Sequence, residues 1–272
     1  MPALAALRSP TPAPRPNARL LALAGLWLGL LVVVQGCGRQ REAGPIHFER
    51  VEDGCELARP RVRGREGGEP FELVVLRLDP ARFSLGAVHD PGLSDAQGFR
   101  EASGALAAIN GHFFDPAYKP LGLLVSDGRE LSRLRKVDHG VFTIAAGRPD
   151  LQHAKAFSRP EALEFAIECG PRLVADGKPL DLKRSRARRT ALGYDAEGRV
   201  LVVASTGVVA LRDLADVLAR PPARGGLGAV GALNLDGGSS TMFDLAAPGR
   251  RISIRSAVRV PVGVVVRRRA ER

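Results

Sequence analysis

Three short turn sequences between apolar runs constrain the fold of this chain most strongly. Asp127-Gly128, Asp176-Gly177 and Glu197-Gly198 each separate two segments that read as β-strands. A two-residue Asp-Gly loop favours a tight turn whose twist matches paired antiparallel strands. The 31 glycines and 20 prolines of the chain are also expected where turns are frequent. The sequence therefore predicts a fold built mainly from antiparallel hairpins.

Helical patterns are few. Residues 211–220 place four apolar side chains on one helical face, and two prolines follow directly. A second, short helix is predicted after Asp95, whose side chain can cap its first turn. The sequence contains no internal repeat and no interior linker. We therefore expect one α+β domain over residues 66–272, with mixed and antiparallel sheets and a few helices.

The N-terminus has the features of an export signal. Three arginines precede an uncharged apolar run over residues 20–36, and the sequence Val-Gln-Gly-Cys ends at Cys37. Residues 1–36 are predicted to be a signal peptide, with a lipid attached at Cys37 as in bacterial lipoproteins. Residues 37–65 are then a tether and domain entry. The alternative is an uncleaved apolar anchor, and in both cases the folded part lies outside the cytoplasm.

The chain is basic, with a formal net charge of +11, and five of the seven residues over 183–189 are basic. Such a charge suits nucleic acid, anionic lipid or an anionic substrate, and export argues against nucleic acid. The basic run is expected to be largely a solvated loop. Cys55 and Cys169 are predicted either to form one disulfide or to be buried thiols. The sequence contains no cysteine pattern of a metal site.

A polar segment after an apolar run near the C-terminus is the clearest candidate for chemistry. The run Ala-Leu-Asn-Leu ends at Asp236, which two glycines and then three hydroxyl residues follow. Glycines allow close approach of a ligand, and hydroxyl groups form neutral hydrogen bonds. Asp236 is therefore a candidate catalytic group, or else it caps a turn. The Gly-x-Gly-x-x-Gly match at residues 226–231 is not a dinucleotide site, because a strand follows it where a helix is needed.

Three other segments place polar residues at predicted turns: Asn110, Gly111 and His112; Glu168; and Arg189 and Thr190. Taken singly, each is a turn residue or a basic strand end, and His112 reads equally well as an exposed polar residue. A metal site formed by His112, His139 and an acid is an alternative. The two histidines, however, lack the spacing of a helical metal motif.

In their order along the chain, these four segments resemble the phosphodiester glycosidase domain family. The similarity rests on the runs NGHFF, PLGLLVSDG, CGPRLVADG, RRTALGYDAEGRV and ALNLDGGSSTMF, and it spans residues 70–266. Each run alone is weak evidence, whereas the ordered set is specific. The sequence departs from the commonest family pattern at His112, where a small residue is frequent, and at Glu168-Cys169. Its LDGGSS segment is also one glycine short.

The resemblance implies a hydrolase that cleaves the glycosyl C–O bond of a sugar-1-phosphodiester. Phosphate leaves as a stable anion, so one carboxylate and a cationic phosphate site can suffice where other glycosidases use two carboxylates. Asp236 is then the catalytic carboxylate and Glu168 the second candidate. Arg189 is expected to bind phosphate, because its planar group matches phosphate oxygens. The residues expected to bind substrate are Asn110, Gly111, His112, Arg189, Thr190, Gly237, Gly238, Ser239 and Ser240.

The implied partners are a glycosyl phosphodiester or cell-envelope glycan, and a membrane reached through the lipid. No cofactor, metal ion, nucleic acid or protein partner is expected. Two other functions suit the same residues: a lipoprotein that binds envelope polysaccharide without turnover, and a metal-dependent phosphodiesterase that cleaves the P–O bond. A second carboxylate within reach of Asp236 favours hydrolysis over simple binding.

Overall fold

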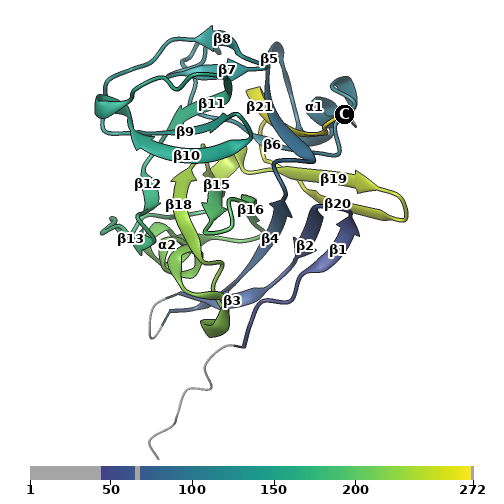
Figure 1. The fold of residues 1–272 in the computed structure, drawn as a ribbon, viewed down its shortest axis with the longest axis vertical. Coiled ribbons are helices and arrows are strands. Elements are labelled where there is room, and N and C mark those ends of the chain that lie inside the picture. The colour runs from purple at the N-terminus through teal and green to yellow at the C-terminus, as the bar shows by residue number, and fades with distance from the viewer. Residues whose placement is uncertain (1–43, 65–67, 271–272) are drawn as a thin grey trace, which may run out of the picture. The chain divides into compact units, whose positions relative to one another are not determined.

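The computed structural model describes residues 44–64 and 68–270, so the predicted signal peptide and Cys37 lie outside the described residues. Strands dominate this part of the chain, and two short α-helices accompany them (Figure 1). Every strand pairing within it is antiparallel. The α+β fold expected from the sequence is confirmed.

The largest sheet has nine strands in the order β1-β2-β4-β16-β15-β18-β12-β13, with β3 also paired to β4. Its strands are β1 (Glu49–Glu52), β2 (Cys55–Ala58), β3 (Arg61–Arg63), β4 (Pro70–Leu78), β12 (Arg172–Ala175), β13 (Lys178–Pro179), β15 (Thr190–Asp195), β16 (Val200–Ser205) and β18 (Ala229–Asn234). The first three strands fall within residues 37–65, so the sheet begins in the stretch that leads into the predicted domain.

Three smaller sheets accompany it among the described residues. One has the order β10-β9-β11-β7-β8, with β7 (Leu124–Ser126), β8 (Arg129–Ser132), β9 (Gly140–Ala145), β10 (Arg148–His153) and β11 (Leu163–Cys169). Another has the order β20-β19-β6-β21-β5, with β5 (Phe83–Ser94), β6 (Ala107–Asn110), β19 (Phe243–Ala247), β20 (Arg250–Ile254) and β21 (Val260–Arg268). A short pair joins β14 (Arg186–Ala187) to β17 (Val209–Ala210).

The nine-stranded sheet is buried on both faces, which explains its long apolar runs. In β4, Val74 and Leu76 pack into a core shared with the two five-stranded sheets. Leu73 and Val75 face the opposite way, into the layer that contains α2 (Leu211–Ala219). Because side chains alternate between the faces of a strand, a sheet covered on both sides needs apolar residues at consecutive positions.

Both predicted helices are present. The first, α1 (Ala96–Ala102), begins after Asp95, whose carboxylate accepts a hydrogen bond from the Gly98 N–H at 2.8 Å. The second, α2, packs on β12, β13 and β18, and its predicted apolar face is buried: Leu211, Leu214, Ala215 and Leu218. Short 3-10 turns are η1 (Ala154–Ala156), η2 (Pro222–Arg224) and η3 (Gly238–Ser240). No helix of the described residues is long and apolar enough to cross a membrane.

The predicted hairpins turn where expected. Asp127 and Gly128 connect β7 to β8 with φ angles of 52° and 77°, and Asp176 and Gly177 connect β12 to β13 with φ angles of 51° and 70°. A turn with positive φ at both central residues matches the twist of paired strands. The β15–β16 hairpin also has a left-handed glycine, Gly198, at φ 77°. The residues of each turn therefore account for the pairing of β7 with β8, of β12 with β13 and of β15 with β16.

Candidate active site

Four segments that are distant in the sequence meet at the end of β18. The backbone N–H groups of residues 234–236 donate, in order, to the carbonyls of Pro171, Thr190 and Gly111, at 3.0, 2.8 and 3.2 Å. These bonds join the end of β18 to the chain after β11, to the start of β15 and to the chain after β6. The four segments singled out in the sequence therefore share one region of the fold.

Asn110 holds the backbone of Asp236 in place. Its side-chain N–H donates to the Asp236 carbonyl at 2.7 Å, and its side-chain oxygen accepts from Thr190 Oγ1 at 2.6 Å and from the Met242 N–H at 3.2 Å. Asn110 and Thr190 are 1% and 0% exposed. Both were expected to bind substrate, and the structure gives their polar groups partners inside the protein. Their observed contacts position Asp236.

The Asp236 side chain is partly buried, two residues after the end of β18. Its Oδ1 accepts the Gly237 N–H at 2.9 Å, and the Ser240 side chain also forms a hydrogen bond with the carboxylate. Burial nevertheless raises the pKa of Asp236 above its ordinary value, because a charge is costly away from water, and the two hydrogen bonds only partly oppose this. A carboxylate with a raised pKa is a better base and nucleophile than a solvated one.

Arg189 lies beside the same loop as a buried cation with no carboxylate partner among the described residues. It is 7% exposed, and its Nη2 donates to the carbonyl and hydroxyl of Ser185 at 2.7 and 3.0 Å. Its Nε has no hydrogen-bond partner, and a Cβ placed on Gly237 would lie 3.8 Å from its Nη1. Burial lowers the pKa of Arg189, but an arginine stays charged. An unpaired guanidinium here is suited to a phosphate group.

The remainder of the basic run behaves differently. Arg184 and Arg186 are exposed, and Arg186 pairs with Glu69 at 2.9 Å. Arg188 is partly buried, and its Nη2 donates to the Thr241 carbonyl at 2.9 Å. The first part of the run is thus solvated as expected, whereas its last two arginines pack against residues 237–241.

The two glycines after Asp236 serve the packing of this loop. A Cβ on Gly237 would come within 2.8 Å of the Arg188 carbonyl, and the Gly238 N–H donates to that carbonyl at 2.8 Å. Gly238 has a φ of 63°, which favours glycine. We expected these glycines to admit a ligand. The structure shows that Gly237 lets the loop approach the chain at Arg188, while a Cβ on Gly238 would meet nothing within 4 Å.

Glu168 is fully buried in β11 and lies next to His139. Its Oε2 accepts the N–H groups of Leu123 and Arg135, both at 2.9 Å, and its Oε1 lies 3.5 Å from His139 Nδ1. Neither Oε1 nor Nδ1 has a hydrogen-bond partner. The His139 side chain is 25% exposed. The His139 ring therefore lies between the buried Glu168 carboxylate and the solvent.

His139 is the site candidate that sequence reasoning missed, apart from its place in the metal alternative. A Cβ on Gly170 would lie 2.8 Å from the His139 ring, and the Gly170 carbonyl accepts a hydrogen bond from the Asn234 side chain at 3.0 Å. Asn234 lies two residues before Asp236. The available clue was a histidine directly before an apolar strand, β9, which alone is weak evidence.

His112 is buried, so the alternative reading as an exposed polar residue is wrong. It is 1% exposed, and neither ring nitrogen has a hydrogen-bond partner. Burial lowers the pKa of His112 to about 4, because the charged ring is poorly solvated inside the protein. This position therefore holds a neutral imidazole inside the protein.

We expect His112 to make the protein sensitive to acid. Between pH 4 and pH 6.5 the unfolded chain binds a proton at His112 that the folded chain does not, so stability rises with pH in this window. Between pH 7 and pH 4 the free energy of unfolding should therefore fall by about 3 kcal/mol more in the wild type than in His112→Gln. Urea unfolding at several pH values measures this difference.

The His112→Phe variant provides a second reference, because it removes both the titration and the buried polar atoms. Carboxylates elsewhere titrate equally in all three proteins and cancel in the comparison. The prediction is wrong if the free energy of unfolding changes with pH in the same way in the wild type and in both variants. The His112 ring would then be protonated as readily in the folded protein as in the unfolded chain.

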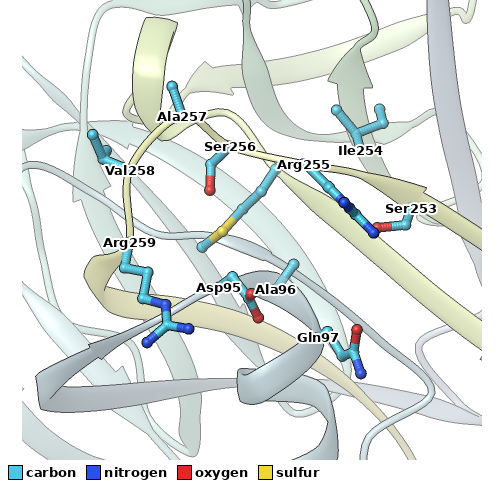
Figure 2. A pocket seen from close by; sticks show the side chains of 11 residues that line it. Asp95, Ala96, Gln97, Ser253, Ile254, Arg255, Ser256, Ala257, Val258 and Arg259 are labelled. Atoms are coloured by element: carbon cyan, nitrogen blue, oxygen red, sulfur yellow. The ribbon is translucent and has the colours of Figure 1, made fainter.

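A cavity adjoins the loop that follows Asp236. Ser239 is exposed, and its carbonyl accepts the N–H groups of Ala257 and Val258 at 2.8 and 3.3 Å. These two residues line a cavity of about 310 Å³, whose other walls are the start of α1 and the end of β20 (Figure 2). Asp236 does not line it. The cavity therefore lies beside the candidate active site and does not enclose the carboxylate.

The other residues considered from the sequence lie outside this arrangement. Asp115 caps its own turn, because its Oδ1 accepts the N–H groups of Ala117 and Lys119 at 2.8 and 2.9 Å. Cys55 and Cys169 are buried free thiols, and burial raises the pKa of Cys55 to about 12. Among the described residues, no three His, Cys, Asp or Glu side chains are grouped so that they could hold a metal ion.

Comparison with known proteins identifies a family and a sequence relative. The family model described as phosphodiester glycosidase matches residues 103–267, which is more than half of the chain. The uncharacterized protein YigE of Escherichia coli strain K12 is 29% identical over 79 residues, covering 26% of this chain and 31% of that protein. The alignment thus spans less than a third of that relative.

Solved structures that share the fold include the following two. One is the catalytic domain of zebrafish N-acetylglucosamine-1-phosphodiester alpha-N-acetylglucosaminidase, auto-inhibited by its pro-peptide, with 16% identity and a TM-score of 0.65 over 83% of this chain and 87% of that one. The other is a hypothetical protein from Synechocystis, with 17% identity and a TM-score of 0.59 over 84% of this chain and 64% of that one. These likenesses concern the fold, and the family match is independent of them. The chain belongs to the phosphodiester glycosidase family.

Proposed function

We propose that the protein is an exported, lipid-anchored hydrolase that cleaves the glycosyl C–O bond of a sugar-1-phosphodiester. The observation that supports this most is a carboxylate on the loop after β18, with a cation that has no anionic partner among the described residues beside the same loop. Asn110 fixes the backbone of Asp236, and the buried guanidinium of Arg189 lies against Gly237. A carboxylate suits the positive charge that develops on the sugar, and the guanidinium suits the phosphate.

In the proposed reaction, the bond between C1 of the sugar and the phosphate oxygen breaks, and both electrons leave with the phosphate. Arg189 binds the phosphate oxygens, and Asp236 either stabilises the positive charge at C1 or bonds to it. Water supplies a hydroxyl group to C1 and gives up one proton. The products are the free sugar and a phosphate monoester.

Glu168 acts through His139 in this proposal. The carboxylate is 0% exposed, so the His139 ring is the part of the pair that can reach a ligand. A carboxylate beside Nδ1 orients a histidine ring, as in other catalytic pairs. His139 then accepts the proton of the attacking water. Ser240 forms a hydrogen bond with the Asp236 carboxylate, and Ser239, which is exposed, binds a sugar hydroxyl in this proposal.

The location of the protein is proposed from the sequence alone. Residues 1–36 are the signal peptide, Cys37 is the site of lipid attachment, and residues 66–272 form the hydrolase domain together with β1, β2 and β3. The substrate is then a glycosyl phosphodiester or a glycan of the cell envelope. Mass spectrometry of the mature N-terminus tests this assignment, with a lipid-modified Cys37 expected and an intact Met1 as the contrary result.

The reaction itself is tested by turnover in water labelled with ¹⁸O. The full-length protein, purified in detergent, is incubated with a panel of glycosyl phosphodiesters. Cleavage of the C–O bond leaves the phosphate monoester free of label, whereas cleavage of the P–O bond introduces ¹⁸O into it. Labelled phosphate, together with loss of activity on chelation, would support the metal-dependent phosphodiesterase. Tight binding of every candidate without turnover would support the polysaccharide-binding lipoprotein.

A further inference from the structure

The cavity beside Ser239 is polar and basic. Figure 2 shows Asp95 and Gln97 from the start of α1 on one side, and residues 253–259 on the other. Hydroxyl and amide groups of Ser253, Ser256 and Gln97 line it together with two arginines. Its volume of about 310 Å³ is at the lower end of the range of small-molecule sites. This combination suits a hydrated, anionic ligand better than an apolar one.

The positive charges of both arginines at this cavity are not balanced by an ion pair within the described residues. Arg255 and Arg259 are exposed, and neither has a side-chain hydrogen bond or an ion pair within the described residues. On the preceding strand, β20, the arginines are paired: Arg250 contacts Glu49 at 2.8 Å, and Arg251 lies 3.7 Å from the buried Asp244. The charge at the cavity is therefore a local feature of residues 255–259, not a general property of that hairpin.

Asp95 is the one carboxylate that lines the cavity. Its Oδ1 already accepts the Gly98 N–H at 2.8 Å, and no ion pair joins it to either arginine in this part of the chain. Two guanidinium groups thus face one carboxylate that is engaged as a helix cap. The net charge at the cavity is positive, so an anionic group of a ligand would be attracted to it.

Hydrogen bonds join the wall of the cavity to the loop of the candidate active site. The N–H groups of Ala257 and Val258, which form part of its wall, donate to the carbonyl of Ser239. Met242, which also lines it, donates its N–H to the side chain of Asn110, which in turn binds the Asp236 carbonyl. The position of the cavity relative to Asp236 is therefore fixed by the same hydrogen bonds that fix the loop.

We propose that this cavity is a second anion-binding subsite, and that the substrate is a polymer with a phosphodiester in each repeat. Arg189 lies beside the loop at Gly237, whereas the wall of the cavity is hydrogen-bonded to the loop at Ser239. A phosphate held by Arg189 leaves Arg255 and Arg259 for another anionic group of the same ligand. In a glycan with repeating phosphodiesters, the neighbouring phosphate supplies that group. The inference rests on the proposed function, whose phosphate site it extends.

The test compares one phosphodiester with an oligomer of the same repeat. The full-length protein in detergent is assayed with both, in the wild type and in the double variant Arg255→Gln/Arg259→Gln. For the wild type, we expect a KM for the oligomer about tenfold below that for the single diester, as one added charged contact of about 1.4 kcal/mol would give. In the double variant the ratio of the two KM values should approach one.

Arg184→Gln is the matched control, because Arg184 is an exposed arginine that does not line the cavity. It should retain the wild-type ratio. Added salt should lower the preference of the wild type for the oligomer and have little effect on the double variant. Equal KM values for both ligands in the wild type, or a preference that persists in the double variant, would overturn the inference.

A failure of the proposed function is recognised separately. If no substrate is turned over, the dissociation constants of the same two ligands are measured by calorimetry. A preference for the oligomer that the double variant removes would still support the subsite, on a protein that binds without cleaving. Equal dissociation constants would reject the subsite as well.

Discussion

The Asp236→Asn variant is expected to fold normally and to bind a glycosyl phosphodiester, but to lose about a thousandfold or more in turnover. The amide keeps the size of the side chain and an oxygen that can accept the Gly237 N–H. It removes the negative charge that opposes the positive charge on the sugar in the transition state. Burial raises the pKa of Asp236, so the uncharged amide should also leave the thermal stability equal or higher.

The same pKa predicts the pH dependence of the wild type. The ionised carboxylate is the active form, so activity should fall with acid at a pH above that at which a solvated aspartate titrates, about 3.9. Single-turnover rates across pH measure this limb, and circular dichroism monitors the fold.

Asp115→Asn is the matched control for this variant, since Asp115 also accepts backbone N–H groups in a loop but caps only its own turn. It should retain activity. Near-normal turnover of Asp236→Asn would remove Asp236 from the mechanism and leave the Glu168–His139 pair as the better candidate. Unfolding of Asp236→Asn would instead assign Asp236 a capping role.

The Arg189→Lys variant is expected to lose about a hundredfold in kcat/KM, although its charge is conserved. The guanidinium is 7% exposed and binds Ser185 through Nη2, which leaves its other nitrogens for a ligand. A lysine ammonium is a point charge and cannot form the planar, two-bond contact with phosphate oxygens. The loss should be seen in the affinity for inorganic phosphate as well as in turnover.

Arg186→Lys is the control for this substitution, because Arg186 lies in the same basic run but is exposed and paired with Glu69. It should behave as the wild type. Equal and mild losses for Arg184→Lys, Arg186→Lys and Arg189→Lys would indicate a diffuse basic surface and not a specific phosphate ligand. A thermal melt separates loss of binding from loss of the buried side chain's packing.

The parts of the fold that the sequence predicted depend on neighbouring residues. The Asp127-Gly128 and Asp176-Gly177 turns and the Asp95 cap are formed within a few positions, so a short window of sequence contains their cause. The strand β10 was not predicted, because RPDLQH has a proline and no apolar alternation. It lies at the edge of its sheet, where such residues are tolerated.

The candidate site was predictable only in part, because its contacts join distant segments. The sequence identified Asp236 as an acid at the end of an apolar strand, which the structure shows. It did not identify the burial of His112 or the contact of His139 with Glu168, since neither segment has a pattern that implies the other. The internal bonds of Asn110 were missed for the same reason: an asparagine at a turn is ordinary until its partners are known.

The hydrogen bonds of Asn110 also determine when the site can form. Its partners Thr190, Asp236 and Met242 lie 80, 126 and 132 residues further along the chain. Asn110 itself pairs with Gly263 of the last strand. Contacts between such remote residues close large loops, and closing them costs conformational entropy. A growing or translocating chain therefore has no assembled Asp236 loop until its final strand is in place, and under the proposed export its activity arises only after the chain has left the cytoplasm.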